Sequence, residues 1–220
     1  SDSVYGCAGQ RCLAASTVVL VGNAKEKFTE KIIEAAKSKT TCYGLDKSSQ
    51  MGAIITKESK NRILEIIDNA EKKGANLLLD GRKKEVENYE AGNYIFPTII
   101  SDVPADAEAD TTEIFGPVMN LKYVETLDDA INFVNSGLYG NAACIFTSSG
   151  SSARKFRHDA LAGNIGVNIG VPAPMAFFPF SGWRGSFFGD LHGQSKHAVE
   201  FYTQTKVVIE RWHDEWSRTF

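Results

Sequence analysis

The sequence has little that would fit a membrane, disulfide-stabilised or nucleic-acid-binding protein. None of its apolar runs approaches the roughly 18 residues of a membrane-spanning helix. Its four cysteines are too few and too scattered for a disulfide scaffold. Lys and Arg number 24 against 27 Asp and Glu, so the formal charge is −3 and no basic surface for nucleic acid is expected. The 220 residues, 43% of them hydrophobic, indicate an ordinary globular protein.

Several sequence motifs of known chemistry are also missing. There is no G-x-G-x-x-G, no phosphate-binding G-x-x-x-x-G-K-[ST] and no zinc-binding H-E-x-x-H. Cys7 and Cys12 have no second Cys/His pair, and His192 and His197 lack a metal-binding spacing, so we predict no metal. No charged stretch followed by an apolar run lies near Ser1, so we expect no secretory leader. The segments that are candidates for chemistry begin so close to Ser1 that we expect the chain to be a truncated piece of a longer protein.

Apolar runs alternate along the chain with amphipathic segments. We expect strands at 17–21, 76–79, 94–100, 118–124, 142–147 and 164–168, and helices at 24–39, 57–73, 126–136, 151–161 and 194–202. This alternation predicts an α/β fold with a mainly parallel sheet flanked by helices. A last strand, Thr205–Arg211, has an alternating apolar pattern that suits pairing with another chain.

Cys12, in the segment Gly9-Gln10-Arg11-Cys12, is the first candidate for chemistry. A cysteine attacks as the thiolate, which a neighbouring positive charge such as Arg11 favours. Gly9 permits a tight turn whose free backbone amides could stabilise an oxyanion on a carbon bound to sulfur. An isolated cysteine is more often a buried small apolar residue, which is how we interpret Cys7, Cys42 and Cys144.

Two further segments are candidates for ligand binding. In Glu113-Ile114-Phe115-Gly116-Pro117, a carboxylate could bind ribose hydroxyls and the aromatic ring could lie against a heterocycle. By spacing alone, a solvated Glu113 and a core Phe115 at a strand entry are the more common outcome. The aromatic, glycine-rich loop 177–189 fits either a pocket lining or structural packing, because so many aromatic side chains are rarely left in water.

Taken together and in order, these segments resemble the catalytic half of the NAD(P)-dependent aldehyde dehydrogenase family. The matching motifs are Gly9–Cys12, Glu113–Pro117 and Pro179–Ser186, and the resemblance extends to about Trp212. Arg11 before the cysteine, the tract 178–192 and the ending Phe201–Lys206 resemble the methylmalonate-semialdehyde dehydrogenase branch. That branch is CoA-acylating: it converts methylmalonate or malonate semialdehyde to propionyl- or acetyl-CoA in valine catabolism, with loss of one carbon.

The resemblance implies a role for each matching residue. Cys12 would attack the aldehyde and form a thioacyl enzyme, from which CoA takes the acyl group. Arg11 would bind the substrate carboxylate, and Phe180 would line the substrate pocket. Glu113 would hold the nicotinamide ribose of NAD, and Phe115 would pack beside the ring. The implied partners are a small semialdehyde and CoA, with no nucleic acid and no membrane.

The resemblance also implies a domain organisation. Residues 1–203 would be the catalytic domain, and 204–220 a bridging strand and tail through which a homo-oligomer forms. The NAD-binding half and the oxyanion-hole asparagine lie upstream of the cysteine in the family, so we expect this chain alone to be inactive. A hydrolytic enzyme that releases a free acid, or a non-catalytic remnant, remains an alternative. The expected location is the cytoplasm in a bacterium or the mitochondrial matrix in a eukaryote.

Overall fold

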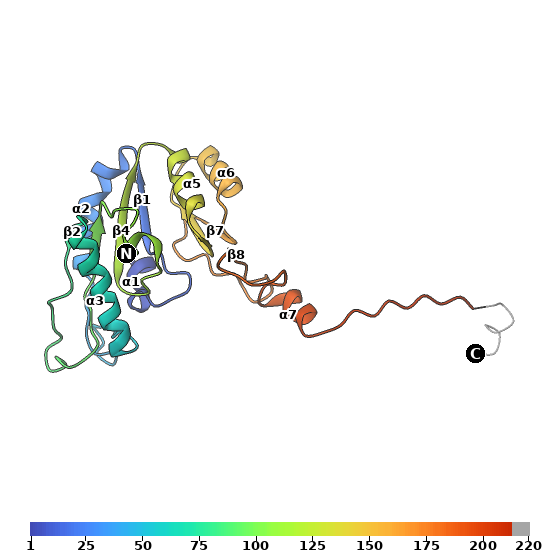
Figure 1. Cartoon of the computed structure of the whole chain (residues 1–220), viewed down its shortest axis with the longest axis horizontal. Helices are drawn as coiled ribbons and strands as arrows, with labels where there is room; N and C mark the ends of the chain where they lie inside the picture. The colour runs from blue at the N-terminus through green and yellow to red at the C-terminus, as the bar shows by residue number, and fades with distance from the viewer. Residues whose placement is uncertain (213–220) are drawn as a thin grey trace.

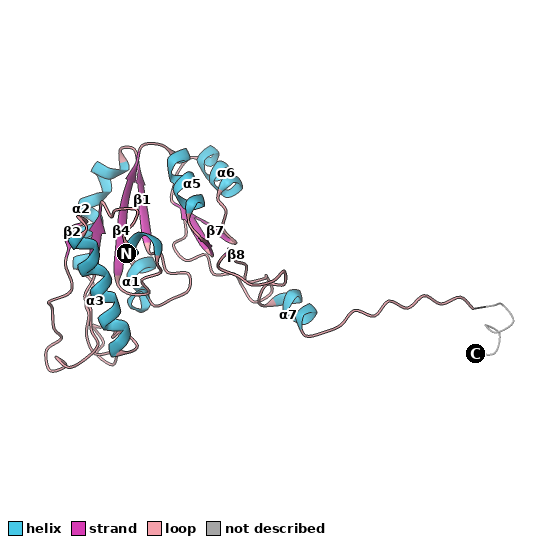
Figure 2. Cartoon of the chain, in the orientation of Figure 1, coloured by secondary structure: helices cyan, strands magenta, loops and turns pink. Residues whose placement is uncertain are grey.

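A four-stranded sheet forms the centre of the N-terminal part of the molecule, in the computed structural model that describes residues 1–212 (Figures 1 and 2). The strand order is β1-β4-β3-β2. β1 and β3 both run parallel to β4, while β2 runs antiparallel to β3. The predicted α/β fold with a mainly parallel sheet is thus confirmed. The strands are β1 (Thr17–Val21), β2 (Asn76–Leu79), β3 (Thr98–Ser101) and β4 (Val118–Val124).

Helices cover this sheet as the apolar periodicity predicts. α2 (Ala24–Lys37) packs against β1 and β2. α3 (Lys57–Lys72) begins after Thr56, whose side chain accepts a hydrogen bond from the Ser59 amide and so caps the helix. The buried residues of α3 are Ile63, Ile66, Ile67 and Ala70, the stripe expected from their helical spacing. Two short helices, α1 (Asp2–Tyr5) and α4 (Glu108–Thr111), were not predicted.

The main hydrophobic core lies between this sheet and its helices. All four residues of β3 are buried, as expected for a strand covered on both faces. Ile99, Ile100 and Leu121 have no exposed surface at all. Burial of each such side chain contributes about 1.5–3 kcal/mol. This core therefore holds the sheet as a rigid platform for the loops at its edges.

A smaller unit follows in the chain and lies beside the sheet (Figure 1). Its first helix, α5, begins with a capping box between Thr126 and Asp129 and packs against β1 and β4. Parallel strands β6 and β7 form its two-stranded sheet, and Ile131, Phe156 and Ala160 form its small core. A second ribbon pairs β5 with β8. The elements are α5 (Leu127–Ser136), β5 (Tyr139–Gly140), β6 (Ala142–Ile145), α6 (Gly150–Asp159), β7 (Asn164–Val167) and β8 (Trp183–Arg184).

The end of the chain differs from the expectation. After α7 (Ser195–Phe201) the backbone extends away from the molecule (Figure 1), and the predicted strand Thr205–Arg211 pairs with no strand among the described residues. Ile209 is 93% exposed. A strand needs a partner edge for its backbone hydrogen bonds, and this single chain supplies none there. Bridging between subunits stays a prediction, and residues 213–220 of the predicted tail lie outside the described part.

Two smaller differences concern strand boundaries and membrane spans. The expected strand 94–100 begins only at Thr98, directly after Pro97, which has no N–H to give to a sheet ladder. Among residues 1–212, no helix combines the length and the apolar character that crossing a bilayer requires.

Candidate active site

Cys12 lies on a turn with an unusual backbone conformation. After α1, three consecutive residues adopt left-handed φ values: 54° at Cys7, 54° at Ala8 and 71° at Gly9. Such a conformation costs about 1–2 kcal/mol for each residue with a side chain. The turn projects Cys12 from the surface, where its side chain is exposed. An accessible sulfur is what a nucleophile requires.

The turn is fastened to the sheet through Tyr5 and Gln10. Tyr5 is buried, its hydroxyl donates to the Thr98 carbonyl (3.1 Å), and burial raises the pKa of that hydroxyl. The Gln10 side chain accepts from the Ile55 amide (2.8 Å) and donates to the Ala53 carbonyl (3.2 Å). These contacts fix both ends of the left-handed segment against the N-terminal part of the molecule.

The second predicted segment lies directly against this turn. A Cβ atom at Gly9 would come within 2.0 Å of the Gly116 carbonyl oxygen, so the two backbones touch. Glu113 is exposed, Phe115 is 39% exposed, and Ile114 between them is buried. The expectation of a core Phe115 is therefore wrong. Glu113 and Phe115 are both accessible to a ligand, beside the cysteine turn, as the resemblance implied.

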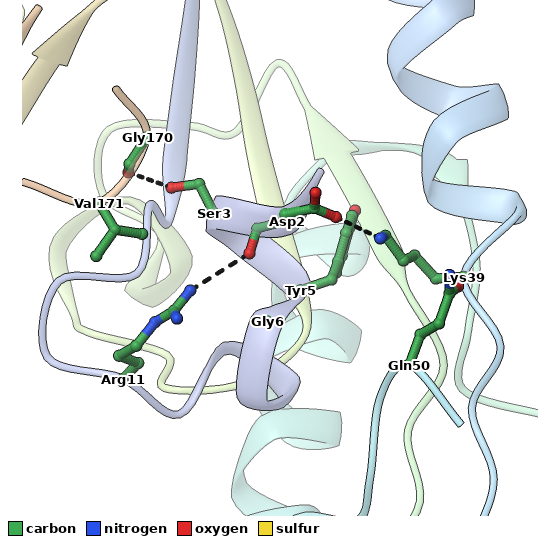
Figure 3. A pocket seen from close by; sticks show the side chains of 9 residues that line it. All are labelled: Asp2, Ser3, Tyr5, Gly6, Arg11, Lys39, Gln50, Gly170 and Val171. Carbon is green, nitrogen blue, oxygen red and sulfur yellow. Dashed lines mark hydrogen bonds and ion pairs between the residues drawn. The ribbon is translucent and has the colours of Figure 1, made fainter. Parts of the chain in front are cut away.

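Arg11 is half-buried, and its guanidinium points toward Asp2 in a cavity of about 470 Å³ (Figure 3). Its guanidinium lies over Gly6 and donates to the Asp2 carbonyl at 3.4 Å, while its buried Nε has no partner. Lys39 reaches the same cavity and pairs with the Asp2 carboxylate, which lowers the pKa of Asp2. The cavity lining is Asp2, Ser3, Tyr5, Gly6, Arg11, Lys39, Gln50, Gly170 and Val171.

The structure does not bring all the predicted residues into that one cavity. Cys12, Glu113, Phe115 and Phe180 are absent from its lining. Phe180 is half-buried in the aromatic loop, where its amide donates to the Gly193 carbonyl (2.6 Å). Most of the loop's other aromatic side chains are exposed; Phe178 is 57% and Phe188 95% exposed. Phe177 and Phe178 contact each other, with ring centroids 4.9 Å apart. None of the loop's aromatic side chains lines the cavity beside Arg11.

The other cysteines differ from one another. Cys7 is exposed, which contradicts its interpretation as a buried apolar residue. Cys7 and Ala8 share a left-handed φ of 54°, but the Ala8 methyl group is buried while the Cys7 side chain faces outward. Cys144 is half-buried in β6, and burial raises the pKa of its thiol. All four thiols are free.

The sequence analysis assigned no role to three side chains that organise this region, although Asn141 and Arg184 lie in segments that resemble the family. Asn141 donates to the Cys12 carbonyl (2.8 Å), and Asn164 donates to the Ser181 carbonyl (2.6 Å). Arg184 donates to five backbone carbonyls, which belong to Val134, Asn135, Gly137, Tyr139 and Leu161. Their partners are backbone atoms far away in the sequence, so no residue pattern signals them.

Comparison with known proteins identifies the class. The model of the aldehyde dehydrogenase family matches residues 1–208, nearly all of the described chain. The chain belongs to the aldehyde dehydrogenase family.

Within this family, the chain is similar to one group of enzymes. It is 46% identical to malonate-semialdehyde dehydrogenase 2 of Geobacillus kaustophilus over 96% of this chain and 43% of the relative. It is 48% identical to the acylating mitochondrial methylmalonate-semialdehyde dehydrogenase of Arabidopsis thaliana, over 96% of this chain and 34% of the relative. The predicted branch is thereby confirmed. The chain spans less than half the length of these relatives.

A solved structure agrees with this assignment. A Sinorhizobium meliloti protein assigned as a methylmalonate-semialdehyde dehydrogenase, solved as a complex with NAD, superposes with a TM-score of 0.93. It is 34% identical, and the match covers 97% of this chain and 44% of the other. The fold prediction is therefore confirmed at the level of the family.

Proposed function

We propose that this chain carries the cysteine chemistry of an NAD-dependent, CoA-acylating dehydrogenase acting on methylmalonate or malonate semialdehyde. The observation that carries the proposal is the contact between the exposed Cys12 turn and the Glu113–Pro117 turn through Gly9 and Gly116. A nucleophile and an accessible carboxylate–aromatic pair come together there from segments about a hundred residues apart. The similarity to the semialdehyde dehydrogenases supports the substrate class.

The proposed chemistry at Cys12 is acyl transfer through a thioester. The thiolate adds to the aldehyde carbon, and the backbone N–H of Cys12 donates a hydrogen bond to the oxyanion that forms. Transfer of hydride from that carbon, for which bound NAD would supply the acceptor, leaves an acyl group on sulfur. The bond between the substrate carboxylate and the α-carbon would then break, releasing carbon dioxide, and the α-carbon would take up a proton. The thiolate of CoA then attacks the acyl carbon, forms acyl-CoA and releases the Cys12 thiolate, so sulfur returns to its starting state.

Arg11 is the proposed contact for the substrate carboxylate. A guanidinium suits a carboxylate because its N–H groups form a planar fork. In this structure that fork has spare donors, since its contact with the Asp2 carbonyl is long and Nε is unpartnered. Phe180 is half-buried in the aromatic loop, which supports a role in the apolar side of the substrate pocket.

Glu113 and Phe115 are the proposed contacts for NAD. Both side chains are accessible, and Arg62 holds the backbone between them by donating to the carbonyls of Glu113 and Ile114. A carboxylate fits ribose hydroxyls, and an exposed ring fits a flat heterocycle. When bound, NAD supplies the hydride acceptor. We infer that residues 1–203 act as the catalytic domain. This chain alone is expected not to bind NAD tightly and not to turn over, while transfer of an acyl group between CoA and Cys12, which needs no NAD, should be retained. Calorimetry that shows micromolar NAD binding would contradict the first expectation.

We further infer a homo-oligomer formed through the end of the chain. Residues 204–212 are extended and exposed, with Val207 and Ile209 apolar and free of packing contacts in the core. Deleting the residues after Gln204 is expected to abolish any dimer, and unchanged sedimentation would refute this. The Arabidopsis relative is mitochondrial, which supports a matrix location if the source is a eukaryote, with the cytoplasm as the counterpart in a bacterium.

The acyl-transfer step can be tested without NAD. If CoA attack on the thioester is reversible, the thiolate of Cys12 will attack propionyl-CoA, forming propionyl-Cys12 and releasing CoA thiolate. We expect peptide mass spectrometry to find the propionyl group on Cys12, with free CoA released in equal amount. Cys12→Ala should abolish both signals, and Cys7→Ala, the matched change at the neighbouring exposed thiol, should leave them intact. An unmodified wild-type Cys12 would overturn the proposal.

The same adduct separates acylating from hydrolytic chemistry. In a CoA-acylating enzyme, propionyl-Cys12 should persist in buffer after excess propionyl-CoA is removed and should disappear on addition of free CoA. In a hydrolytic enzyme, water would remove the acyl group at a rate that CoA does not change. A non-catalytic remnant would form no adduct.

A further inference from the structure

The cysteine turn is held from two opposite sides. On the side of the large sheet, Gln10 contacts Ala53 and Ile55 through its side-chain amide. On the side of the smaller unit, Asn141 Nδ2 donates to the Cys12 carbonyl oxygen at 2.8 Å. Asn141 lies between β5 and β6, so this bond connects the turn to a second rigid element.

A second asparagine, Asn164, links Asn141 to the aromatic loop. The Asn141 carbonyl accepts from both the backbone amide and Nδ2 of Asn164, each at 3.0 Å. Asn164 is 7% exposed, and its Nδ2 also donates to the Ser181 carbonyl at 2.6 Å. Two side-chain amides therefore form one bridge from the Cys12 carbonyl to the residue that follows Phe180. We call Asn141 and Asn164 the amide bridge.

The geometry points to a positioning role: we propose that the amide bridge sets the orientation of Cys12 relative to the aromatic loop that carries Phe180. The Cys12 carbonyl belongs to the peptide unit attached to the Cys12 Cα, so fixing it restricts rotation about that atom and the direction in which sulfur projects. Attack on a carbonyl needs alignment of sulfur, acyl carbon and oxyanion donor, and small misplacements of a reacting atom reduce rates strongly. The bridge is uncharged, so it orients the thiolate without pairing with it.

This inference rests on the proposed function, because orientation matters only if Cys12 attacks a carbonyl carbon. The proposed role of Asn141 is not that of an oxyanion-hole donor. Its Nδ2 donates to the backbone carbonyl of Cys12, whereas an oxyanion-hole group donates to the oxygen of the substrate. The bridge also explains why a polar side chain is buried at Asn164, because its Nδ2 donates to two backbone carbonyls.

Asn141→Asp is the most direct variant, because it preserves shape while an oxygen replaces the Nδ2 donor. The matched control is Asn168→Asp. Asn168 spans the same pair of strands at their other end, where its side chain accepts from the Thr147 amide (2.9 Å) and donates to the Thr147 carbonyl (3.0 Å). Both variants lose one amide donor to a backbone carbonyl, but only one of these carbonyls belongs to Cys12.

The experiment measures the rate at which propionyl-CoA acylates Cys12 in the 220-residue chain, as a function of propionyl-CoA concentration. We expect Asn141→Asp to lower the limiting rate about ten- to hundredfold and to leave the half-saturating concentration within about twofold. Asn168→Asp should leave both within about twofold. Asn141→Asp combined with Asn164→Ala should be no slower than the slower of the two single variants, because both changes break the same bridge.

Alkylation of Cys12 by iodoacetamide, followed in the same variants, separates orientation from shielding. This reaction needs an accessible thiolate but no oxyanion donor, so its rate should change less than about threefold in Asn141→Asp. Equal acylation rates in Asn141→Asp and the wild type would overturn the inference, as would an equal loss in Asn168→Asp or a parallel fall in alkylation. A wild-type Cys12 that accepts no acyl group would overturn the proposed function and this inference together.

Discussion

The sheet of β1 to β4 and the smaller unit on β6 and β7 are held together in different ways. The first encloses a continuous apolar cluster in which many side chains are completely buried. The second has a core of only Ile131, Phe156 and Ala160. Partly buried apolar side chains, among them Val134 and Ile165, pack against that core, and polar side chains add further contacts. Arg184 bonds to five carbonyls around the end of α5, and Asn135 connects α5 to the end of α6 and to Leu161.

The two kinds of contact have different consequences, one for the stability of the fold and the other for the orientation of its elements. Apolar burial is strong but non-directional, so it determines how firmly the sheet is folded. Hydrogen bonds contribute less net free energy but have strict geometry, so they determine how one element is turned against another. The Cys12 turn lies between the two regions. We therefore expect its reactivity to follow the polar contacts of the smaller unit more closely than the total stability.

The largest expected effect tests the core of the sheet. Ile66→Ala should reduce the free energy of unfolding by about 2–5 kcal/mol, because Ile66 is 1% exposed and its loss leaves a cavity. Ile165→Ala, in the half-buried strand β7, should cost about 1–2 kcal/mol. Urea unfolding monitored by circular dichroism measures both. Equal losses would mean that the two regions do not differ in their dependence on apolar burial.

Gly9 allows a test at the boundary between the core and the site. Gly9→Ala should cost about 2–4 kcal/mol, because it combines a left-handed φ with overlap against the Gly116 backbone. Gly74→Ala is the matched control: its φ is also positive, at 104°, but no atom lies near the added methyl group. It should cost about 1–2 kcal/mol. If both substitutions cost the same, the contact between the two turns is not tight.

The local elements of the large sheet could be predicted because their signals lie within a few residues. The stripe of α3 and the strand Val118–Val124 follow from periodicity alone, and both have the expected bounds to within one residue. The capping box at Thr126 is likewise a local pattern. The antiparallel direction of β2 and the pairing of β5 with β8 were not predictable, because they depend on contacts between distant segments.

In the site, too, local residue patterns could be predicted and contacts between distant segments could not. Cys12 and the Glu113–Pro117 segment could be found because their residue types and order resemble a family. Their contact depends on the left-handed backbone at Gly9, of which glycine itself is the only sequence sign. The bond from Asn141 to Cys12 joins residues 129 apart and ends on a backbone carbonyl, which every residue has. No pattern of side chains could therefore indicate it.

Arg184 tests whether polar contacts hold the smaller unit. Arg184→Met should lower the free energy of unfolding by about 1–3 kcal/mol, because the α5 end loses the donors to its free carbonyls. Hydrogen exchange should quicken around β5 and residues 161–163 before it changes in β3 and β4. Arg157→Met, on the exposed face of α6, is the control and should have little effect. Uniform acceleration throughout the chain would argue against a separate polar unit.

The smallest expected effect concerns an ion cluster beside the sheet, where Arg82, just after β2, pairs with carboxylates of α3. Its guanidinium pairs with Asp80 (2.6 Å) and with Asp68 (2.5 Å) and Glu71 (2.7 Å) of α3. Hydrogen bonds from Arg82 hold the pKa of Asp80 below its ordinary value of about 3.9. Because the pKa is lower in the folded state, the carboxylate stabilises the fold above pH 4 or so, and this contribution disappears as the pH falls through the lowered value.

Asp80→Asn should therefore cost about 1 kcal/mol at pH 7, an amount limited by the partial exposure of the pair. The difference in unfolding free energy between wild type and variant should shrink as the pH is lowered from about 5 to about 2, because the wild-type carboxyl then becomes protonated. Glu87→Gln, at an exposed loop position, is the charge-matched control. A difference that stays constant over this pH range would show that Asp80 acts through its shape and hydrogen bonds rather than through its charge. Directional polar contacts would then contribute at the edge of the large sheet, beside its apolar core, as they do in the smaller unit.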